Sequence, residues 1–330
     1  MKLAIIGATG LVGKTLLALL QERKFPHEEL LLVASAASAG QQVWVADRSY
    51  QLIDLPTAVK EQPMIAIFAT DATVATAWAP RFAAIGTVVV DNSAAWRLHP
   101  NWKLIVPEVN ERLLSPTDRL IANPNCVAIS LVMALAPLHR RYGLKRLVIA
   151  TYQAVSGSGQ AGVDQLMAER SGLASSAHQA YLYPIDQNVI PHIGDFLEDG
   201  YTQEEQKLVD ETQKILEVPT LPITATAVRI PTLRAHAIAV NVELAQDFTL
   251  AGIIQDLQAM PGVVVTDAVQ KHAYPTCIAA QHTDTVFVGR VRKDTSQPRT
   301  LNLWIVADNL RKGAATNALQ IAESWLALRG

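Results

Sequence analysis

The feature that most constrains the fold is an apolar run followed at once by a glycine-rich turn. Leu3–Ile6 is typical of a buried strand, and GATGLVG (7–13) follows it and opens a helical pattern over 11–23. Gly7 and Gly10 allow a tight turn and a close approach of a pyrophosphate to backbone N–H groups, and the third glycine lets helix and strand pack closely. This order predicts a dinucleotide site. The alternative is a purely structural turn.

The rest of the first third alternates strand and helix signals. Helical patterns at 73–85 and 108–114 separate short apolar runs, and this alternation predicts a doubly wound, Rossmann-type parallel sheet in an α/β fold. The further expected strands are Leu30–Ala34, Met64–Phe68, Thr87–Val90, Leu104–Val106 and Leu120–Ala122.

The remainder of the chain predicts a second domain of α+β type. Its longer strand signals suggest a mostly antiparallel sheet with helices on one face. We expect the dinucleotide-binding domain to span 1–125, with a last helix (309–330) packing back on it, and the second domain to span 126–308. The expected strands are Leu144–Val155, 222–230, 236–244, 285–292 and 299–306, with helices near 160–172 and 202–217.

Cys126 is a candidate nucleophile. It follows Asn125, a good N-cap, and precedes the apolar run Val127–Leu135, which reads as a helix. A thiol in the first helical turn is favoured as the thiolate, because N–H groups and the positive end of the helix dipole lie there. The alternative is a small buried apolar residue.

Composition excludes several classes of function. The net charge of −2 leaves no basic excess for nucleic acid or an anionic membrane. No apolar run reaches the roughly 18 residues of a membrane helix. Two cysteines fit a reducing cytoplasm, and no metal site is predicted. We therefore expect a cytoplasmic protein with a small-molecule substrate.

Among the eight histidines, His236 is the best candidate for an acid or base. It ends VRIPTLRAH (228–236), where two arginines and a histidine fall in an otherwise apolar stretch. A lone histidine there would more often be a satisfied core residue, but the flanking cations favour a site that handles anions. His178 and His192 stay open as alternatives.

The chain resembles a known family, the aspartate-β-semialdehyde dehydrogenases, almost from end to end. N-acetyl-glutamyl-phosphate reductases share the layout but typically read Pro-Gly-Cys at the nucleophile, where this chain reads Pro-Asn-Cys. The motifs that carry the resemblance are GATGLVG (7–13), DNSAAWR (91–97), VPEVN (106–110), NPNC (123–126), TYQAVSGSG (151–159), NVIPHI and FLEDGYTQEE (188–205), VRIPTLRAH (228–236), VFVGRVRKD (286–294) and ADNLRKGAA (307–315).

The resemblance implies an activity and a role for particular residues. The activity would be NADPH-dependent reductive dephosphorylation of L-aspartyl-4-phosphate to the semialdehyde and phosphate, in lysine, threonine and methionine biosynthesis. Cys126 would form a thioester, His236 would be the general acid/base, Gln153 would orient the substrate and Arg229 would clamp its α-carboxylate. The remaining implied residues are Arg97 and Lys207 for phosphate, Asn92 and Glu204 in support, and Thr9, Gly10, Leu11, Val12, Ser156, Gly157 and Asn309 along the cofactor.

The resemblance also implies that 126–308 is a catalytic and dimerisation domain, in a homodimer or a dimer of dimers. The cofactor choice depends on the segment after the second strand, where Ser35 and Ser38 stand and no acid does. Hydroxyls suit a 2′-phosphate better than a diol, so NADP is expected. Many members carry Arg where Ala37 stands, which leaves NAD as an alternative cofactor. Val127 and Ala237 also stand where the family commonly has hydroxyl residues.

Several of these residues also allow another interpretation. Glu204 and Lys207 could be an ordinary solvated pair, Arg97 a surface cation and Gln153 a strand residue. The whole chain could be a non-catalytic nucleotide-binding paralogue, or a reductase of another acyl phosphate. Cys277 lacks a helix start and a neighbouring base, and we expect it to be structural.

Overall fold

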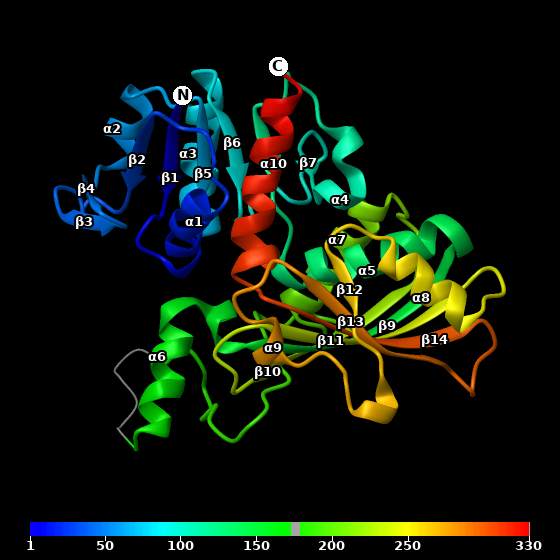
Figure 1. The fold of residues 1–330 in the computed structure, drawn as a ribbon. Coiled ribbons are helices and arrows are strands. Elements are labelled where there is room, and N and C mark those ends of the chain that lie inside the picture. The colour runs from blue at the N-terminus through cyan, green and yellow to red at the C-terminus, as the bar shows by residue number, and fades with distance from the viewer. Residues whose placement is uncertain (173–178, 330) are drawn as a thin grey trace. The chain divides into compact units, whose positions relative to one another are not determined.

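The apolar runs of the first third assemble into one parallel sheet of six strands, in the order β2-β1-β5-β6-β8-β7 (Figure 1). The order reverses beside β1, so the turn after β1 lies at the switch point where nucleotides bind in such sheets. The strands are β1 (Lys2–Ile6), β2 (Glu29–Val33), β5 (Ile65–Phe68), β6 (Val88–Asp91), β7 (Lys103–Leu104) and β8 (Leu120–Ala122).

Helices bury both faces of this sheet. One face packs with residues of α1 and α10, including the fully buried Trp325. The other packs with residues of α2 and α3, including Phe82, whose ring meets Phe68 edge to face. The helices are α1 (Leu11–Glu22), α2 (Leu55–Lys60), α3 (Ala72–Ala84), α4 (Pro107–Asn110) and α10 (Thr316–Ala327).

The structure differs from the expected elements at several places in this part of the chain, and helix α2 is among the elements that were not predicted. A hairpin, β3 (Gln42–Val45) and β4 (Arg48–Gln51), was not predicted, because its strands are only four residues long and largely exposed. The helix expected over 108–114 is the four residues of α4 followed by a 3₁₀ turn, Glu111–Leu113. The last helix begins at Thr316, after a π-helical turn over Arg311–Ala315.

The second sheet is mixed and has the order β10-β9-β11-β14-β13-β12. Its central pairings are antiparallel, as expected, but the edge pairs β10–β9 and β12–β13 are parallel. Helices between the paired edge strands make the crossovers that parallel pairing needs. The strands are β9 (Leu144–Ala154), β10 (Ile223–Ile230), β11 (His236–Leu244), β12 (Val263–Val265), β13 (Val286–Lys293) and β14 (Thr300–Ala307).

Helix α5 packs against this sheet between α7 and α8. It is buried along most of its length, because its sequence is apolar all round. Helix α8 and strand β12 were not predicted. The helices are α5 (Cys126–Tyr142), α6 (Gly159–Arg170), α7 (Gln203–Leu216), α8 (Leu250–Gln258) and α9 (Cys277–Ala280), with 3₁₀ turns at Val155–Ser158 and Val269–Lys271.

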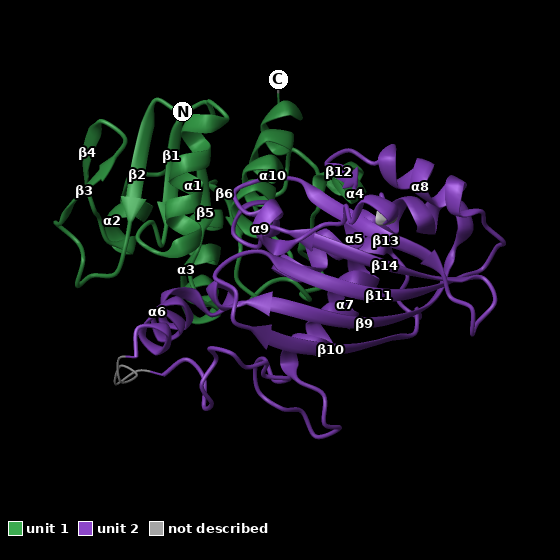
Figure 2. Cartoon of the chain, turned by 60° about the horizontal axis from the view of Figure 1, so that its bottom comes forward, with its two compact units in different colours: residues 1–124, 314–330 green, residues 125–313 purple. Residues whose placement is uncertain are grey.

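The computed structural model describes residues 1–172 and 179–329. The chain divides into two compact units, Met1–Pro124 with Ala314–Gly330, and Asn125–Gly313 (Figure 2). The first holds the parallel sheet and the second holds the mixed sheet. Together they make an α/β protein of the predicted class. Within the described ranges, none of the helices combines the length and the apolar character needed to cross a membrane.

Candidate active site

Cys126 lies in the first turn of α5, and Asn125 caps that helix, as predicted. Asn125 Oδ1 accepts hydrogen bonds from the N–H groups of Val127 (2.8 Å) and Ala128 (3.4 Å). The Cys126 residue is partly exposed, and neither it nor Cys277 is in a disulfide. The positive end of the helix dipole favours a thiolate at this position. The local structure therefore suits Cys126 to nucleophilic attack.

Helix α7 brings further polar residues to the start of α5. Glu204 Oε1 accepts from Asn125 Nδ2 at 3.0 Å and from Gln153 Nε2 at 3.2 Å. Lys207 Nζ lies 3.9 Å from Glu204 Oε2. Glu204 is buried, so the alternative of an ordinary solvated pair is wrong for this residue. The fold gathers Gln153, Glu204 and Lys207 around the residue that caps the helix of Cys126.

The peptide groups of Ala154, at the end of β9, hold Arg229 and His236 of the VRIPTLRAH segment. The Ala154 N–H donates to His236 Nδ1 at 3.0 Å, and the Ala154 carbonyl accepts from Arg229 Nη1 at 2.7 Å. Strand register makes this contact possible, because Arg229 of β10 pairs with Gln153 of β9. Thus Gln153, Arg229 and His236 come to one end of three adjacent strands.

His236 is a buried, neutral imidazole. Burial, together with the positive charge of Arg229, lowers the pKa of His236 from 6.5 to about 3. Because Nδ1 accepts the Ala154 N–H, the ring hydrogen is on Nε2. Nε2 has no hydrogen-bond partner among the described residues. A Cβ atom at Gly157 would lie 3.3 Å from this Nε2 and 2.7 Å from Arg229 Nη1, so a side chain there would displace the Arg229 guanidinium.

Arg229 lines a cavity of about 610 Å³ in the second unit. Its Nε is buried and has no partner within the described part of the chain, and its Cζ lies 5.9 Å from the centroid of the Tyr181 ring. A buried, unsatisfied guanidinium nitrogen is suited to an anion. His192 lines the same cavity, with its ring stacked on Phe196 at 4.2 Å. His178, the other open candidate base, lies outside the described residues.

Asn309 fixes the start of the His236 strand. Its Oδ1 accepts from the Ala235 N–H at 3.0 Å, and its amide nitrogen donates to Ser156 Oγ at 3.0 Å. Ala235 has φ of +70°, an unfavourable conformation for a residue with a Cβ atom. Asn309 and Ser156 are both buried. These two predicted cofactor residues therefore also hold the backbone beside His236.

The glycine turn of the first unit has the expected geometry. Gly7 has φ of +83°, and a Cβ atom there would lie 2.5 Å from the Ala69 carbonyl oxygen. A Cβ atom at Gly13 would lie 2.2 Å from the Gly7 carbonyl oxygen, so the third glycine does allow close packing. Thr9 and Gly10 are exposed, and no side chain caps α1 at Gly10. The exposed, uncapped helix start fits a phosphate group.

Ser35 and Ser38 lie just after the carboxyl end of β2. The Ser35 hydroxyl donates to Ser38 Oγ at 3.3 Å, and Ala37 between them is exposed. Leu11 is partly buried, and Val12 packs on the core of the first unit.

Arg97 and Asn92 belong to the first unit, at the carboxyl ends of β6 and β8. Arg97 donates from Nε to the Asn123 carbonyl at 2.9 Å and from Nη2 to the Asn92 carbonyl at 2.6 Å. Asn92 Oδ1 accepts from Asn123 Nδ2 at 2.9 Å. Arg97 is buried, so the alternative of a surface cation is wrong. Its predicted role in binding phosphate stays a prediction.

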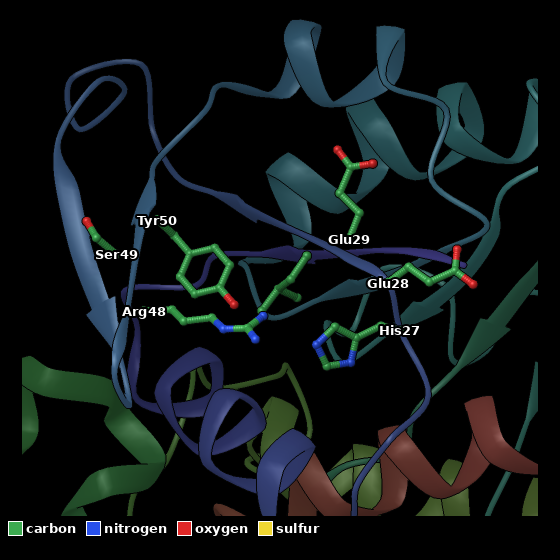
Figure 3. A pocket seen from close by; sticks show the side chains of 7 residues that line it. His27, Glu28, Glu29, Arg48, Ser49 and Tyr50 are labelled. Atoms are coloured by element: carbon green, nitrogen blue, oxygen red, sulfur yellow. The ribbon is translucent and has the colours of Figure 1, made fainter.

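A separate pocket of about 400 Å³ lies beside the start of β2 and the β3–β4 hairpin (Figure 3). Arg48 and Tyr50 reach into it from the hairpin, and His27 lies opposite. The pocket is at the amino end of β2, whereas the glycine turn follows the carboxyl end of β1. None of the predicted site residues lines it.

Two family models match the chain. The semialdehyde dehydrogenase NAD binding domain matches residues 2–116, and the semialdehyde dehydrogenase dimerisation domain matches residues 135–312. The aspartate-semialdehyde dehydrogenase of Aquifex aeolicus is 42% identical over 329 residues, which cover 98% of this chain and 97% of that protein. The chain belongs to the aspartate-semialdehyde dehydrogenase family. The Legionella pneumophila enzyme of the same name is also 42% identical, over 98% of this chain and 95% of its own length.

Solved structures of the aspartate-semialdehyde dehydrogenase family share this fold. The Vibrio cholerae aspartate semialdehyde dehydrogenase II, complexed with ASA, superposes with a TM-score of 0.94 at 38% identity, covering 99% of this chain and 98% of that chain. The predicted family and fold class are therefore confirmed.

Glu211 of α7 also belongs to this site, although its sequence position was not predicted to do so. Its Oε2 accepts from the Asn125 N–H at 2.6 Å, and it is 1% exposed. A signal was available, because Glu204 and Glu211 are seven residues apart and share a helix face with the apolar Leu208 and Ile215. A carboxylate on the apolar face of a helix indicates a specific buried partner.

Proposed function

We propose that this protein catalyses the NADPH-dependent reductive dephosphorylation of L-aspartyl-4-phosphate to L-aspartate-4-semialdehyde and phosphate, serving lysine, threonine and methionine biosynthesis. The observation that carries the proposal is the arrangement of the second unit. In that unit Cys126 lies at the capped start of a helix, and the neutral His236 lies beside the buried Arg229. The sequence of the chain is that of the aspartate-semialdehyde dehydrogenase family.

The proposed reaction begins with Cys126. Its thiolate attacks the acyl carbon to give a tetrahedral oxyanion. Collapse of that oxyanion breaks the bond from the carbon to the phosphate oxygen, releases phosphate and leaves a thioester on Cys126. The chemistry that NADPH would supply when bound is a hydride for reduction of this thioester. His236 Nε2 would donate a hydrogen bond to the oxyanion that this hydride creates, and collapse of that oxyanion would break the carbon–sulfur bond to give the aldehyde. The aldehyde is released and the Cys126 thiolate is restored.

Arg229 would bind the α-carboxylate of the substrate. The buried guanidinium can bind a carboxylate through two hydrogen bonds. Its Nε has no acceptor among the described residues and could form one of them. A bound carboxylate would also offset the Arg229 charge that helps lower the pKa of His236. Gln153 would orient the acyl group. Arg97 and Lys207 would receive the phosphate, with Asn92 and Glu204 holding the surrounding groups.

NADP is the cofactor we propose, with NAD as the alternative. Gly7, Thr9, Gly10, Leu11 and Val12 would hold the pyrophosphate at the start of α1. Ser35 and Ser38 would bind the 2′-phosphate, and the absence of an acid at the end of β2 favours it over a free hydroxyl. Ser156, Gly157 and Asn309 would contact the nicotinamide end.

We further propose that the protein works in the cytoplasm as a homodimer or a dimer of dimers. The match of 135–312 to a dimerisation domain supports self-association. Half-buried aromatic residues on the face of the mixed sheet opposite α5, among them Tyr152, Phe287 and Trp304, would suit a contact with a second copy.

The deciding assay is the reduction of NADP⁺ by aspartate semialdehyde, with and without inorganic phosphate. We expect phosphate-dependent turnover that the Cys126→Ala variant loses. The matched control is Cys277→Ala, which removes the other cysteine and should keep turnover. Activity in Cys126→Ala would refute the nucleophile. Absence of turnover in the wild type would favour a non-catalytic paralogue, and turnover of only N-acetyl-glutamate semialdehyde would favour another acyl phosphate.

A further inference from the structure

We infer that Glu211 is a positioning residue for the nucleophile, which acts by fixing the first turn of α5 through the peptide of Asn125. This inference rests on the proposed function in one respect, the role of Cys126 as nucleophile. It concerns a residue that contacts the helix cap at the Asn125 N–H, in a helix whose Glu204 and Lys207 already have proposed roles.

The first observation is a cap completed by another helix. In an ordinary capping box, a Glu three residues after the N-cap reaches back to the N-cap N–H. That position in α5 is Ala128, which has no acceptor to offer. Glu211 supplies the missing acceptor from α7, because its Oε2 takes the Asn125 N–H at 2.6 Å. The cap of α5 is therefore completed by a tertiary contact.

The second observation is that α7 holds Asn125 at both its backbone and its side chain. Glu211 accepts the backbone N–H, while Glu204 accepts the side-chain amide at 3.0 Å. These two bonds and the two that Asn125 Oδ1 accepts fix both the position and the rotation of the cap. Cys126 is the next residue, so its Cα–Cβ direction follows from the cap.

The third observation is that the Glu211 carboxylate is buried. Glu211 is 1% exposed, and a buried carboxylate is retained only where its bonds offset its lost hydration. A bond from a backbone N–H to a carboxylate is short and strong, which suits a residue that must hold one geometry. An apolar side chain would fill the same space but would leave the Asn125 N–H without this acceptor.

The test separates positioning from folding. The variants are Glu211→Ala, Glu211→Gln and Glu211→Asp, with Glu205→Ala as the matched control. Glu205 is also buried on α7 and also accepts backbone N–H groups, from Thr202 and Ala227, but it does not contact Asn125. The readouts are kcat, KM and the rate of Cys126 alkylation by iodoacetamide, mapped by peptide mass spectrometry.

We expect Glu211→Ala to slow Cys126 alkylation and lower kcat by up to about 100-fold, with KM nearly unchanged, because small displacements of a reacting group have effects of this size. Glu211→Gln keeps an acceptor oxygen at the same reach and should recover most of both rates. Glu205→Ala should alkylate Cys126 at the wild-type rate.

Three results would overturn the inference. They are wild-type alkylation in Glu211→Ala, equal slowing in Glu205→Ala, and a Glu211→Gln variant as slow as Glu211→Ala. If Glu211→Ala does not fold, Glu211→Asp is the variant that tests the inference. Its shorter side chain should slow the alkylation of Cys126 relative to Glu211→Gln. Equal alkylation rates in these two variants would refute the inference. Alkylation needs no substrate, so this result is independent of turnover. Absence of turnover in the wild type would count against the proposed function instead, and activity in Cys126→Ala would refute the role of Cys126 as nucleophile.

Discussion

Acidification should destabilise this protein through His236, and replacing that histidine should remove much of the effect. The perturbation is a change from about pH 6.5 to about pH 4.5, compared between the wild type and His236→Asn. Asn is chosen because its Oδ1 can accept the Ala154 N–H in place of Nδ1, while the side chain does not titrate.

The magnitude follows from the pKa of the buried ring. Burial and the Arg229 charge lower the pKa of His236 from 6.5 to about 3 in the folded protein. Between these values the unfolded chain binds the proton and the folded protein does not. The contribution of His236 to the free energy of unfolding is therefore fully present above pH 6.5. It falls by about 1.4 kcal/mol for each pH unit below that value. At about pH 4.5 the loss is roughly 2.5 kcal/mol.

The assay is urea unfolding at a fixed protein concentration, with the free energy of the two proteins compared at each pH. The difference between them should shrink steadily as the pH falls, because the wild type alone loses the His236 contribution. NMR of labelled imidazoles gives a direct check, since the His236 signal should stay that of a neutral ring at pH 4.5. A signal that titrates near pH 6.5, or parallel pH dependences in the two proteins, would refute the reasoning.

Two further predictions concern residues at the edges of the site. Ala37→Arg should raise the ratio of kcat/KM for NADP⁺ over NAD⁺ by about tenfold or more, through a charge-assisted bond to the 2′-phosphate, and Ala37→Gln is the uncharged control. An unchanged ratio would show that the phosphate lies elsewhere. Asn309→Ala should lower the free energy of unfolding by about 1–3 kcal/mol and reduce kcat, since the Ala235 N–H loses its acceptor. The measurement is urea unfolding, and a wild-type midpoint for Asn309→Ala would contradict this.

Local patterns in the sequence were enough to predict the parallel sheet, the glycine turn and the capped helix at Cys126. The turn and the cap depend on interactions within a few residues, and each strand of the sheet is marked by its own short apolar run. Gly7 needs its positive φ whatever surrounds it, and Asn125 caps the N–H groups that directly follow it. Such signals survive in any tertiary context, which is why these elements appear where the sequence places them.

The tertiary structure alone decided which polar groups meet. The Asn125 N–H and Glu211 are 86 residues apart, Ala154 and His236 are 82 apart, and Gln153 and Glu204 are 51 apart. Pairings of this kind depend on strand register and helix packing, which no short window of sequence contains. The parallel edges of the mixed sheet were missed for the same reason, since the crossover path decides their direction.

The sequence by itself therefore determined the residue types of the site and the helix start that suits a thiolate. Burial of Glu204 and Glu211, and the neutral state of His236, were decided only by the fold. The physical reason is that burial and pKa depend on which surfaces exclude water around a group, and those surfaces come from distant parts of the chain.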